Sequence, residues 1–179
     1  MSPDSLERLR DALPAYARDT ATNMDAVVRA PGRNLTDQQH WGTVLAVAAA
    51  VRAPTTTPVL AAEARRHLAP AAADAALGAA SVMAANAVYF RARHVLPDGY
   101  DGVRAGLRMR LATVPGVGRA DFELWCTAVS AVEGCESCVA SHEATARGAG
   151  LSRAAVNDAL RIAAVVHAVA ATLEAAGLV

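Results

Sequence analysis

Lysine is absent from this chain of 179 residues, and isoleucine, cysteine and aromatic residues are scarce. All 17 cationic residues are arginines, and 17 acidic residues balance them, so the formal net charge is zero. Without a global electrostatic field, neither nucleic acid nor an anionic membrane surface is an expected partner. The three cysteines are an odd number, which excludes the disulfide framework of a small secreted domain.

Long apolar runs are missing as well. No segment reaches 18 uninterrupted apolar residues, so we expect no membrane-spanning helix. The first 16 residues carry acidic side chains and contain no apolar core of the kind that signal peptides have. These absences, together with the cysteine count, predict a cytoplasmic protein.

Alanine is what the chain has in excess. It supplies about a quarter of the residues, and hydrophobic residues together reach 54%. Alanine favours helix because its side chain loses no rotamer entropy there. It also buries little apolar area, at about 0.8 kcal/mol per CH₂, so burial between subunits would compensate. The length suits one ordinary domain or two very small ones, the composition favours helix and a homo-oligomer, and we expect one all-α domain over residues 1–179, a helical bundle.

Capping signals and apolar periodicity divide the chain into helices. Thr36 and Gln39 form the pattern of a capping box ahead of an apolar run. Ser152 and Gly177 have the residue types that begin and end a helix. Prolines and glycines concentrate in residues 95–118, which predicts a loop. Helices are predicted for a short segment that is capped by Asp4 or Ser5 and that Pro14 ends or restarts, for 41–51, and for about 58–68, 71–93, 119–133, 135–148 and 152–176.

The two halves of the chain resemble each other on either side of this loop. The segment WGTVLAVAAAVRAP in the first half matches WCTAVSAVEGCESC in the second, and a second pair of alanine-rich segments follows at nearly the same offset. We therefore predict an internal duplication, with one copy at 41–90 and the other at 125–173. Only the second copy carries cysteines.

Three reactive side chains distinguish the second copy from the first. They are Cys135, Cys138 and His142, and apolar residues occupy the matching positions of the first copy. If both copies form the same structural unit, the fold does not require these side chains. We therefore expect them to serve chemistry. The matching positions are Val51, Pro54 and Pro58.

The spacing of these residues favours a shared helix face. Gly134 suits the end of one helix, so Cys135 is expected at the start of the next. Cys135 and Cys138 then lie on one face, close enough for a disulfide, and His142 follows one turn later. The helix N-terminus and a charged imidazole both favour a thiolate, whereas neighbouring carboxylates oppose it.

Such a Cys-x-x-Cys pair predicts a dithiol peroxidase. One thiolate attacks the O–O bond of a peroxide and becomes a sulfenic acid, and the second thiol condenses with it to close a disulfide. Because His142 aligns with Cys138, we assign attack to Cys138 and resolution to Cys135. Cys135, at the helix start, is expected to be the more accessible to a reducing partner. A thioredoxin-like domain is excluded, because no βαβ pattern surrounds the motif.

Two other interpretations of the cysteines stay open. Buried cysteine often serves as a small hydrophobic residue, and this is what we expect of Cys126, which lies in an apolar run. Alternatively, Cys135, Cys138 and His142 are three ligands of a zinc site that Glu123 completes. The remaining histidines are isolated, and we expect surface or packing roles for His40, His67, His94 and His167.

Glu123 lies twelve residues before the Cys-x-x-Cys motif, and His142 lies four residues after it. This arrangement resembles the alkyl hydroperoxidase D (AhpD) family of the carboxymuconolactone decarboxylase-like superfamily. The resemblance covers nearly the whole chain. It extends through LRDALPAYARD, QQHWGTVLA, AALGAASVMAANAVYFR, GLRMR, FELWCTAVSAVEGC and CVASHE. The resemblance implies an all-α fold with an internal duplication, assembled as a homotrimer.

The resemblance also implies an antioxidant enzyme that reduces alkyl hydroperoxides. Cys138 would form the sulfenic acid, Cys135 would be its partner and proton donor, and Glu123 and His142 would relay protons. No bound cofactor or metal is implied. Electrons would come from the dihydrolipoyl group of a lipoyl-carrier protein and can pass on to a two-cysteine peroxiredoxin.

One position departs from the family pattern. Family members often have a histidine directly before the second cysteine, where this chain has Ser137. A serine hydroxyl can donate a hydrogen bond but cannot become cationic, so one means of favouring a thiolate is missing. We therefore expect the mechanism to stay intact but the rate and the reductant preference to differ.

Two alternatives to a peroxidase remain. A carboxymuconolactone decarboxylase-like enzyme, or another isomerase-like member of the superfamily, would not need the paired thiols. A non-catalytic redox sensor would be oxidised once by peroxide and would show no turnover with excess dithiol.

Overall fold

The computed structural model describes residues 4–30, 32, 34–96, 100, 102–113 and 116–177. These residues form helices and connecting loops and contain no strand, which confirms the predicted all-α class. The η labels mark a 3-10 turn and a π-helical turn. In chain order the elements are α1 (Ser5–Asp11), η1 (Ala15–Ala17), α2 (Arg18–Asn23), η2 (Met24–Arg29), α3 (Asp37–Val51), α4 (Thr57–His67), α5 (Pro70–Val95), α6 (Arg110–Thr113), α7 (Arg119–Val132), α8 (Glu136–Gly148) and α9 (Arg153–Ala176).

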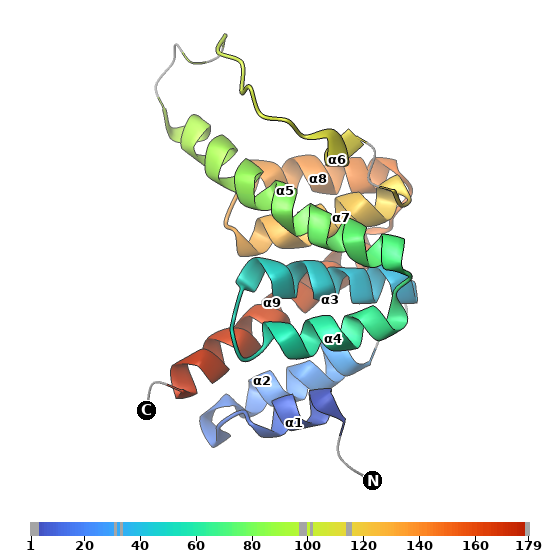
Figure 1. The fold of residues 1–179 in the computed structure, drawn as a ribbon, viewed down its shortest axis with the longest axis vertical. Helices are drawn as coiled ribbons and strands as arrows, with labels where there is room; N and C mark the ends of the chain where they lie inside the picture. Colours follow the sequence, from blue (N-terminus) through green and yellow to red (C-terminus); the bar gives the residue numbers. More distant parts are fainter. Residues whose placement is uncertain are drawn as a thin grey trace.

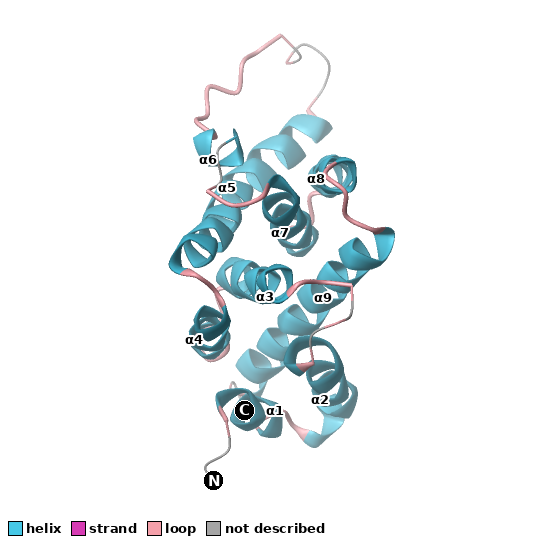
Figure 2. Cartoon of the chain, turned by 90° about the vertical axis from the view of Figure 1, so that its right-hand side faces the viewer, coloured by secondary structure: helices cyan, strands magenta, loops and turns pink. Residues whose placement is uncertain are grey.

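Helices α3 and α7 form the centre of the molecule. Helix α3 packs against α4, α5, α7 and α9, and α7 packs against α5, α8 and α9. Figure 1 shows α5, α6, α7 and α8 together at the upper end and α1, α2 and α4 at the lower end. Helix α9 runs obliquely past α3 toward the lower end (Figure 2). Because α3 and α7 contact each other and most of the remaining helices, the buried side chains form one continuous core.

The helix starts follow the capping signals in the sequence. The Asp4 side chain accepts a hydrogen bond from the backbone N–H of Glu7, at the start of α1. At α3, Thr36 and Gln39 make both reciprocal bonds of a capping box. Ser152 accepts a bond from the third residue of α9 at 3.0 Å. The predicted caps are therefore confirmed, and each satisfies a backbone donor that the helix leaves free.

A close approach between α3 and α7 depends on a glycine. A Cβ atom added to Gly42 would overlap the indole ring of Trp125. The ring fills this space with no exposed surface, and its Nε1 donates to the carbonyl of Gln39 at 3.2 Å. Glycine costs about 1 kcal/mol relative to alanine inside a helix. The packing of the tryptophan explains why the site tolerates that cost.

The sequence missed two groups of short elements. It assigned no element to residues 15–29, where η1, α2 and η2 lie, and it predicted only a loop where α6 lies. Tertiary contacts hold these segments. Asp25 of η2 forms an ion pair with Arg10 of α1 at 3.2 Å, and Leu111 of α6 packs on Gly78 of α5. Contacts between distant residues leave no periodic signal in the local sequence.

Helices α5 and α9 are long and apolar enough to cross a membrane by length and composition. The absence of an uninterrupted apolar run therefore excluded less than we expected, because helices interrupted by a few charges meet the same criterion. In each helix about half of the most apolar stretch of 18 residues is buried inside the protein, 50% in α5 and 44% in α9. Core helices of soluble proteins share these properties.

The order of helices repeats in the two halves. Two shorter helices, α3 and α4, precede the long α5, and two shorter helices, α7 and α8, precede the long α9. This order is compatible with the proposed duplication of 41–90 and 125–173 within one domain, both of which stay predictions. The halves differ where the reactive residues lie, because α4 begins at Thr57, whereas α8 begins directly after Cys135.

Candidate functional site

The turn between α7 and α8 is built by a single glycine. Gly134 has φ of 70°, a left-handed conformation that glycine adopts without steric cost. Its N–H bonds to the carbonyl of Ala131, and the N–H of Cys135 bonds to the carbonyl of Ser130 at 3.1 Å. This pair of bonds closes α7 in a Schellman motif. The carbonyl of Cys135 then accepts from Val139, so the residue that ends one helix also caps the next.

Two arginines hold this turn from other helices. Arg91 of α5 donates from Nη1 to the carbonyl of Glu133 at 2.7 Å, which is one of the carbonyls that α7 leaves free. Arg52, directly after α3, forms an ion pair with the Glu133 carboxylate at 3.6 Å. The position of the first cysteine is therefore fixed by α3 and α5 as well as by its own helices.

Cys135 and Cys138 are joined by a disulfide. Cys135 is the N-cap of α8, and Cys138 lies in its first turn. Both sulfurs belong to the core, with Cys135 1% and Cys138 6% exposed. By exposure of the residue itself, Cys135 is not the more accessible of the two in the disulfide form, contrary to the expectation, although the cavity that it lines is the more open one. Cys135 is buried because the Schellman turn folds it back against the end of α7.

Glu123 and His142 form a pair beside the disulfide. Glu123 Oε2 on α7 lies 2.6 Å from His142 Nδ1 on α8, and the two helices lie side by side (Figure 1 and Figure 2). The carboxylate is 5% exposed, and its Oε1 is 3.6 Å from Nε of Arg119. Because a carboxylate accepts only, the proton of this bond belongs to Nδ1. The pair therefore fixes the orientation of the ring and leaves Nε2 for exchange with another group.

The two cysteines line different cavities. Cys138 lines a cavity of about 190 Å³ together with His142, Ser137 and residues of α5. Cys135 lines a more open cavity of about 460 Å³ together with Glu136 and Glu143. These cavities share no lining residue. Two reactants can therefore approach the two sulfurs from separate sides.

The structure thus brings together the site residues predicted from the sequence, and their neighbours differ. Ser137 Oγ lies 3.6 Å from Cys135 Sγ, although the residue also lines the Cys138 cavity. Glu143 forms a 3.7 Å ion pair with Arg147, and Glu136 follows Cys135 directly in the chain. Glu136 and Glu143 line the cavity of Cys135 and not that of Cys138, so their carboxylates oppose negative charge mainly on Cys135.

Cys126 is separate from this pair. Its thiol is free and fully buried in α7. Burial raises the pKa of the Cys126 thiol far above its ordinary value, and the nearby charge of Glu123 raises it further. A thiol in this state is not a nucleophile, so the predicted packing role is confirmed. No group of three or more His, Cys, Asp or Glu residues that could hold a metal ion occurs among the described residues.

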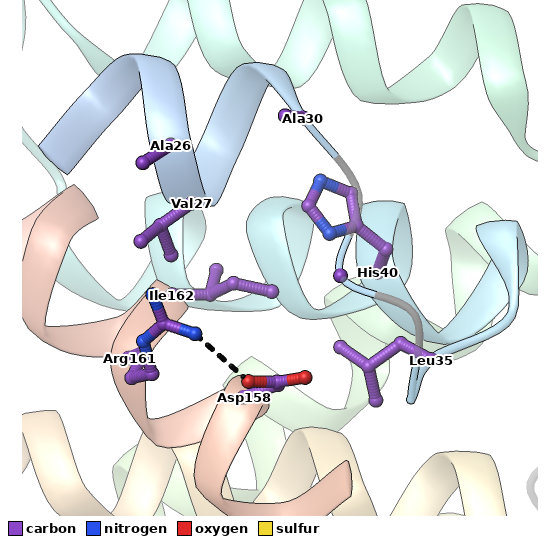
Figure 3. A pocket seen from close by; sticks show the side chains of 9 residues that line it. Ala26, Val27, Ala30, Leu35, His40, Asp158, Arg161 and Ile162 are labelled. Carbon is purple, nitrogen blue, oxygen red and sulfur yellow. Dashed lines mark hydrogen bonds and ion pairs between the residues drawn. The ribbon is translucent and has the colours of Figure 1, made fainter. Parts of the chain in front are cut away.

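A second buried polar cluster surrounds His40. His40 Nε2 lies 2.9 Å from the carbonyl of Val28, and its Nδ1 has no hydrogen-bond partner. Burial lowers the pKa of this histidine, so the neutral ring is favoured. Beside it is a cavity of about 20 Å³, where Asp158 bonds to Arg161 (Figure 3). This space suits one water-sized molecule, and no thiol lines it, so the cluster is not part of the redox site.

Three residues that line the Cys138 cavity were not predicted from the sequence, namely Asn86, Phe90 and Ser141. Of these, Asn86 on α5 is 6% exposed and has an Oδ1 atom without a hydrogen-bond partner. The signal was present in the sequence, because Asn86 is a polar amide inside the apolar run SVMAANAVYF. Only the packing of α5 against α8 shows which cavity it lines.

Comparison with known proteins places these features in a family. Residues 100–179 match the family model described as the carboxymuconolactone decarboxylase family. Over nearly its whole length the chain is similar to proteins named "Alkyl hydroperoxide reductase AhpD". The protein from Mycolicibacterium paratuberculosis is 49% identical over 171 residues, which cover 96% of this chain and 95% of the relative. Those from Frankia alni and Nocardia farcinica are 50% and 47% identical, covering 96% and 92% of this chain and 92% and 91% of the relatives.

Proposed function

This chain belongs to the AhpD family of the carboxymuconolactone decarboxylase-like superfamily, and on that basis we propose that it is an antioxidant dithiol peroxidase that reduces alkyl hydroperoxides to alcohols. One observation carries the proposal. Cys138 shares a cavity with His142, whose ring is oriented by a buried carboxylate 2.6 Å away, and a second cysteine is close enough to form a disulfide.

The reaction begins with both cysteines reduced. The Cys138 thiolate attacks the terminal oxygen of the hydroperoxide, so an S–O bond forms and the O–O bond breaks. The terminal oxygen keeps its hydrogen as a sulfenic acid, and the alkoxide leaves as the alcohol after taking a proton from His142. The Cys135 thiolate then attacks the Cys138 sulfur, the disulfide forms, and hydroxide leaves as water after protonation.

The surroundings of the two sulfurs support this division of roles. Both cysteines lie at the N-terminus of α8, where the helix dipole favours a thiolate. Cys138 faces the imidazole, whereas Cys135 shares its cavity with the carboxylates of Glu136 and Glu143. An imidazolium favours a thiolate and carboxylates oppose it. We therefore assign attack to Cys138 and resolution to Cys135, with Glu123 and His142 as the proton relay.

The disulfide must be reduced before the next turnover. We propose that the dihydrolipoyl group of a lipoyl-carrier protein supplies the two electrons by thiol–disulfide exchange. The open cavity beside Cys135 offers a dithiol an approach that does not cross the Cys138 cavity. We also propose that the protein can pass electrons on to a two-cysteine peroxiredoxin. This chemistry needs no bound cofactor or metal.

Exposed apolar side chains support the proposed homotrimer. Apart from Tyr16 on η1, the large exposed apolar side chains of the described residues belong to the second half of α5 and to residues 96–107, and exposed apolar surface of this kind favours an interaction with another chain. Burial of such side chains between subunits would add to a core built from small residues. A cytoplasmic location, also proposed, keeps thiols reduced between turnovers. The exposed residues assigned to this surface are Val88, Val95, Leu96, Tyr100 and Leu107, whereas Phe90 and Val103, which are also exposed, line a cavity next to the redox site.

Steady-state turnover tests this function. The protein is mixed with cumene hydroperoxide and excess dihydrolipoamide, and consumption of the hydroperoxide is followed for the wild type, Cys138→Ser and Cys135→Ser. Of these three proteins, we expect only the wild type to show turnover. Cys126→Ala is the control and should retain turnover. Turnover that survives in both active-site variants would overturn the thiol mechanism. A single stoichiometric oxidation of the wild type would indicate a redox sensor, and a lactone reaction independent of both thiols a decarboxylase-like enzyme.

A further inference from the structure

Asn86 has an unusual environment for a buried amide. The residue is 6% exposed on α5, and its Oδ1 makes no hydrogen bond with the protein. Its Nδ2 has only a weak partner, the sulfur of Met83 at 3.9 Å. An unsatisfied buried polar group costs about 1–3 kcal/mol. Such a cost is explained when the group binds a ligand.

The cavity that Asn86 lines contains the reacting sulfur. Cys138 and His142 of α8 and Asn86 of α5 line the same space of about 190 Å³. A molecule that reaches Cys138 therefore lies beside a carboxamide whose Oδ1 has no hydrogen-bond partner and whose Nδ2 has only the Met83 sulfur.

A carboxamide and a hydroperoxide group are complementary, because each has a hydrogen-bond donor and an acceptor close together. The terminal oxygen of a hydroperoxide carries an O–H donor, and the adjacent oxygen is an acceptor. We propose that Asn86 binds the hydroperoxide group and holds its terminal oxygen toward Cys138. This inference rests on the proposed peroxidase function and identifies a substrate-binding residue for it.

The amide acts most strongly as the O–O bond breaks. Oδ1 accepts the O–H of the terminal oxygen and directs that oxygen toward the Cys138 thiolate. Nδ2 donates to the second oxygen, on which negative charge develops before it leaves as the alcohol with a proton from His142. A donor aimed at developing charge in a site shielded from water stabilises the transition state more than the ground state.

The neighbouring surface fits the organic part of the substrate. Phe90 lies one turn after Asn86 on α5 and lines both the Cys138 cavity and an adjoining cavity of about 360 Å³. Tyr89 and Val103 also line the second space. An alkyl or aryl group attached to the bound hydroperoxide can extend over these side chains. The arrangement therefore favours organic hydroperoxides over hydrogen peroxide.

The two half-reactions test this role separately. The reduced protein is mixed with cumene hydroperoxide in a stopped-flow instrument, and the disulfide form is mixed with dihydrolipoamide. For Asn86→Leu we expect the rate constant of oxidation to fall about 100-fold, the size typical of losing one positioned donor. Reduction of the disulfide should stay within about threefold of the wild type. Asn157→Leu, the same change at an exposed helix position, should alter neither rate.

Asn86→Asp and Asn86→Ser supply polar replacements should the leucine variant fail to fold. An ionised aspartate can accept a hydrogen bond but cannot donate one, so the rate constant of oxidation should also fall in Asn86→Asp. Oxidation of Asn86→Leu or Asn86→Asp within about threefold of the wild type would overturn the assignment. A parallel fall of both half-reactions would overturn it too, because it indicates a structural role. If the wild type itself is not oxidised, the proposed peroxidase function is wrong. If the wild type and the variants are oxidised equally fast, only the role of Asn86 is wrong.

Discussion

At the scale of single residues, the two sulfurs of one disulfide have different chemical neighbours. Cys138 faces an imidazole held by Glu123, and Cys135 faces two carboxylates and the Ser137 hydroxyl. All of these neighbours except Glu123 lie on α8, and Glu123 orients the imidazole from α7. The roles of the two cysteines follow from this asymmetry.

The Glu123–His142 pair should matter for oxidation more than for folding. In Glu123→Gln the side chain can still hydrogen-bond to Nδ1, but it no longer fixes the proton there or stabilises a charged ring. We expect the rate constant for oxidation by cumene hydroperoxide to fall about 100-fold, within the range of a general acid–base contribution. Stopped-flow kinetics measure the rate. Asp74→Asn, which removes an exposed carboxylate on α5, is the control and should leave the rate unchanged.

Ser137→His restores a residue type that family members often have. The hydroxyl of Ser137 is 3.6 Å from Cys135 Sγ, so a cationic ring at this position would favour a thiolate on the neighbouring cysteine. We expect faster hydroperoxide turnover with dihydrolipoamide. An unchanged or slower rate in the steady-state assay would count against this explanation of the position.

At the scale of helices, features that depend on neighbouring residues could be predicted from the sequence, whereas features that depend on contacts between distant residues could not. The caps at Thr36 and Ser152 and the turn at Gly134 depend on neighbouring residues, so the sequence predicted them. The pairing of Glu123 with His142 was implied by family resemblance, but its geometry depends on the packing of two helices. Asn86 was missed because only tertiary structure turns an amide within an alanine-rich helix toward Cys138.

Replacement of Gly42 by alanine tests the close approach of α3 and α7. Alanine should gain about 1 kcal/mol of helix propensity. Its Cβ would overlap the Trp125 ring, however, and overpacking of this kind typically costs about 1–3 kcal/mol. Because the overlap is with a buried ring, we expect a net loss of up to about 2 kcal/mol in the free energy of unfolding, measured by urea denaturation. Gly148→Ala, where an added Cβ meets nothing within 4 Å, should not destabilise the protein; equal effects at both sites would contradict the packing account.

At the scale of the whole molecule, the buried acidic and histidine side chains of the described residues lie at two separate sites. One is the redox site between α7, α8 and α5, and the other surrounds His40 between η2, α3 and α9. The first has a histidine next to a sulfur, whereas the second holds a neutral histidine against a backbone carbonyl. The second cluster therefore bears on stability and not on redox chemistry.

His40 should make the folded state sensitive to acid. Burial lowers its pKa in the folded protein, while the unfolded chain titrates near the ordinary value of 6.5. As the pH falls below about 6.5, the unfolded state binds the proton first, so the free energy of unfolding decreases until the folded pKa is reached. Urea denaturation at pH 7.5 and 5.5 should show a smaller decrease for His40→Gln than for the wild type. The exposed His94→Gln control should behave as the wild type does, and an equal decrease in all three proteins would contradict the role of His40.

The central claim is that an alkyl hydroperoxide oxidises Cys138 to a sulfenic acid. In Cys135→Ser no resolving thiol is present, so the sulfenic acid persists and can be trapped with dimedone. We predict that, after one equivalent of cumene hydroperoxide, mass spectrometry finds the dimedone adduct on Cys138. The same treatment of Cys138→Ser should give no adduct on Cys135 above that of an untreated sample. A Cys135→Ser protein without an adduct, or an adduct mainly on Cys135 of the Cys138→Ser variant, would contradict the assignment.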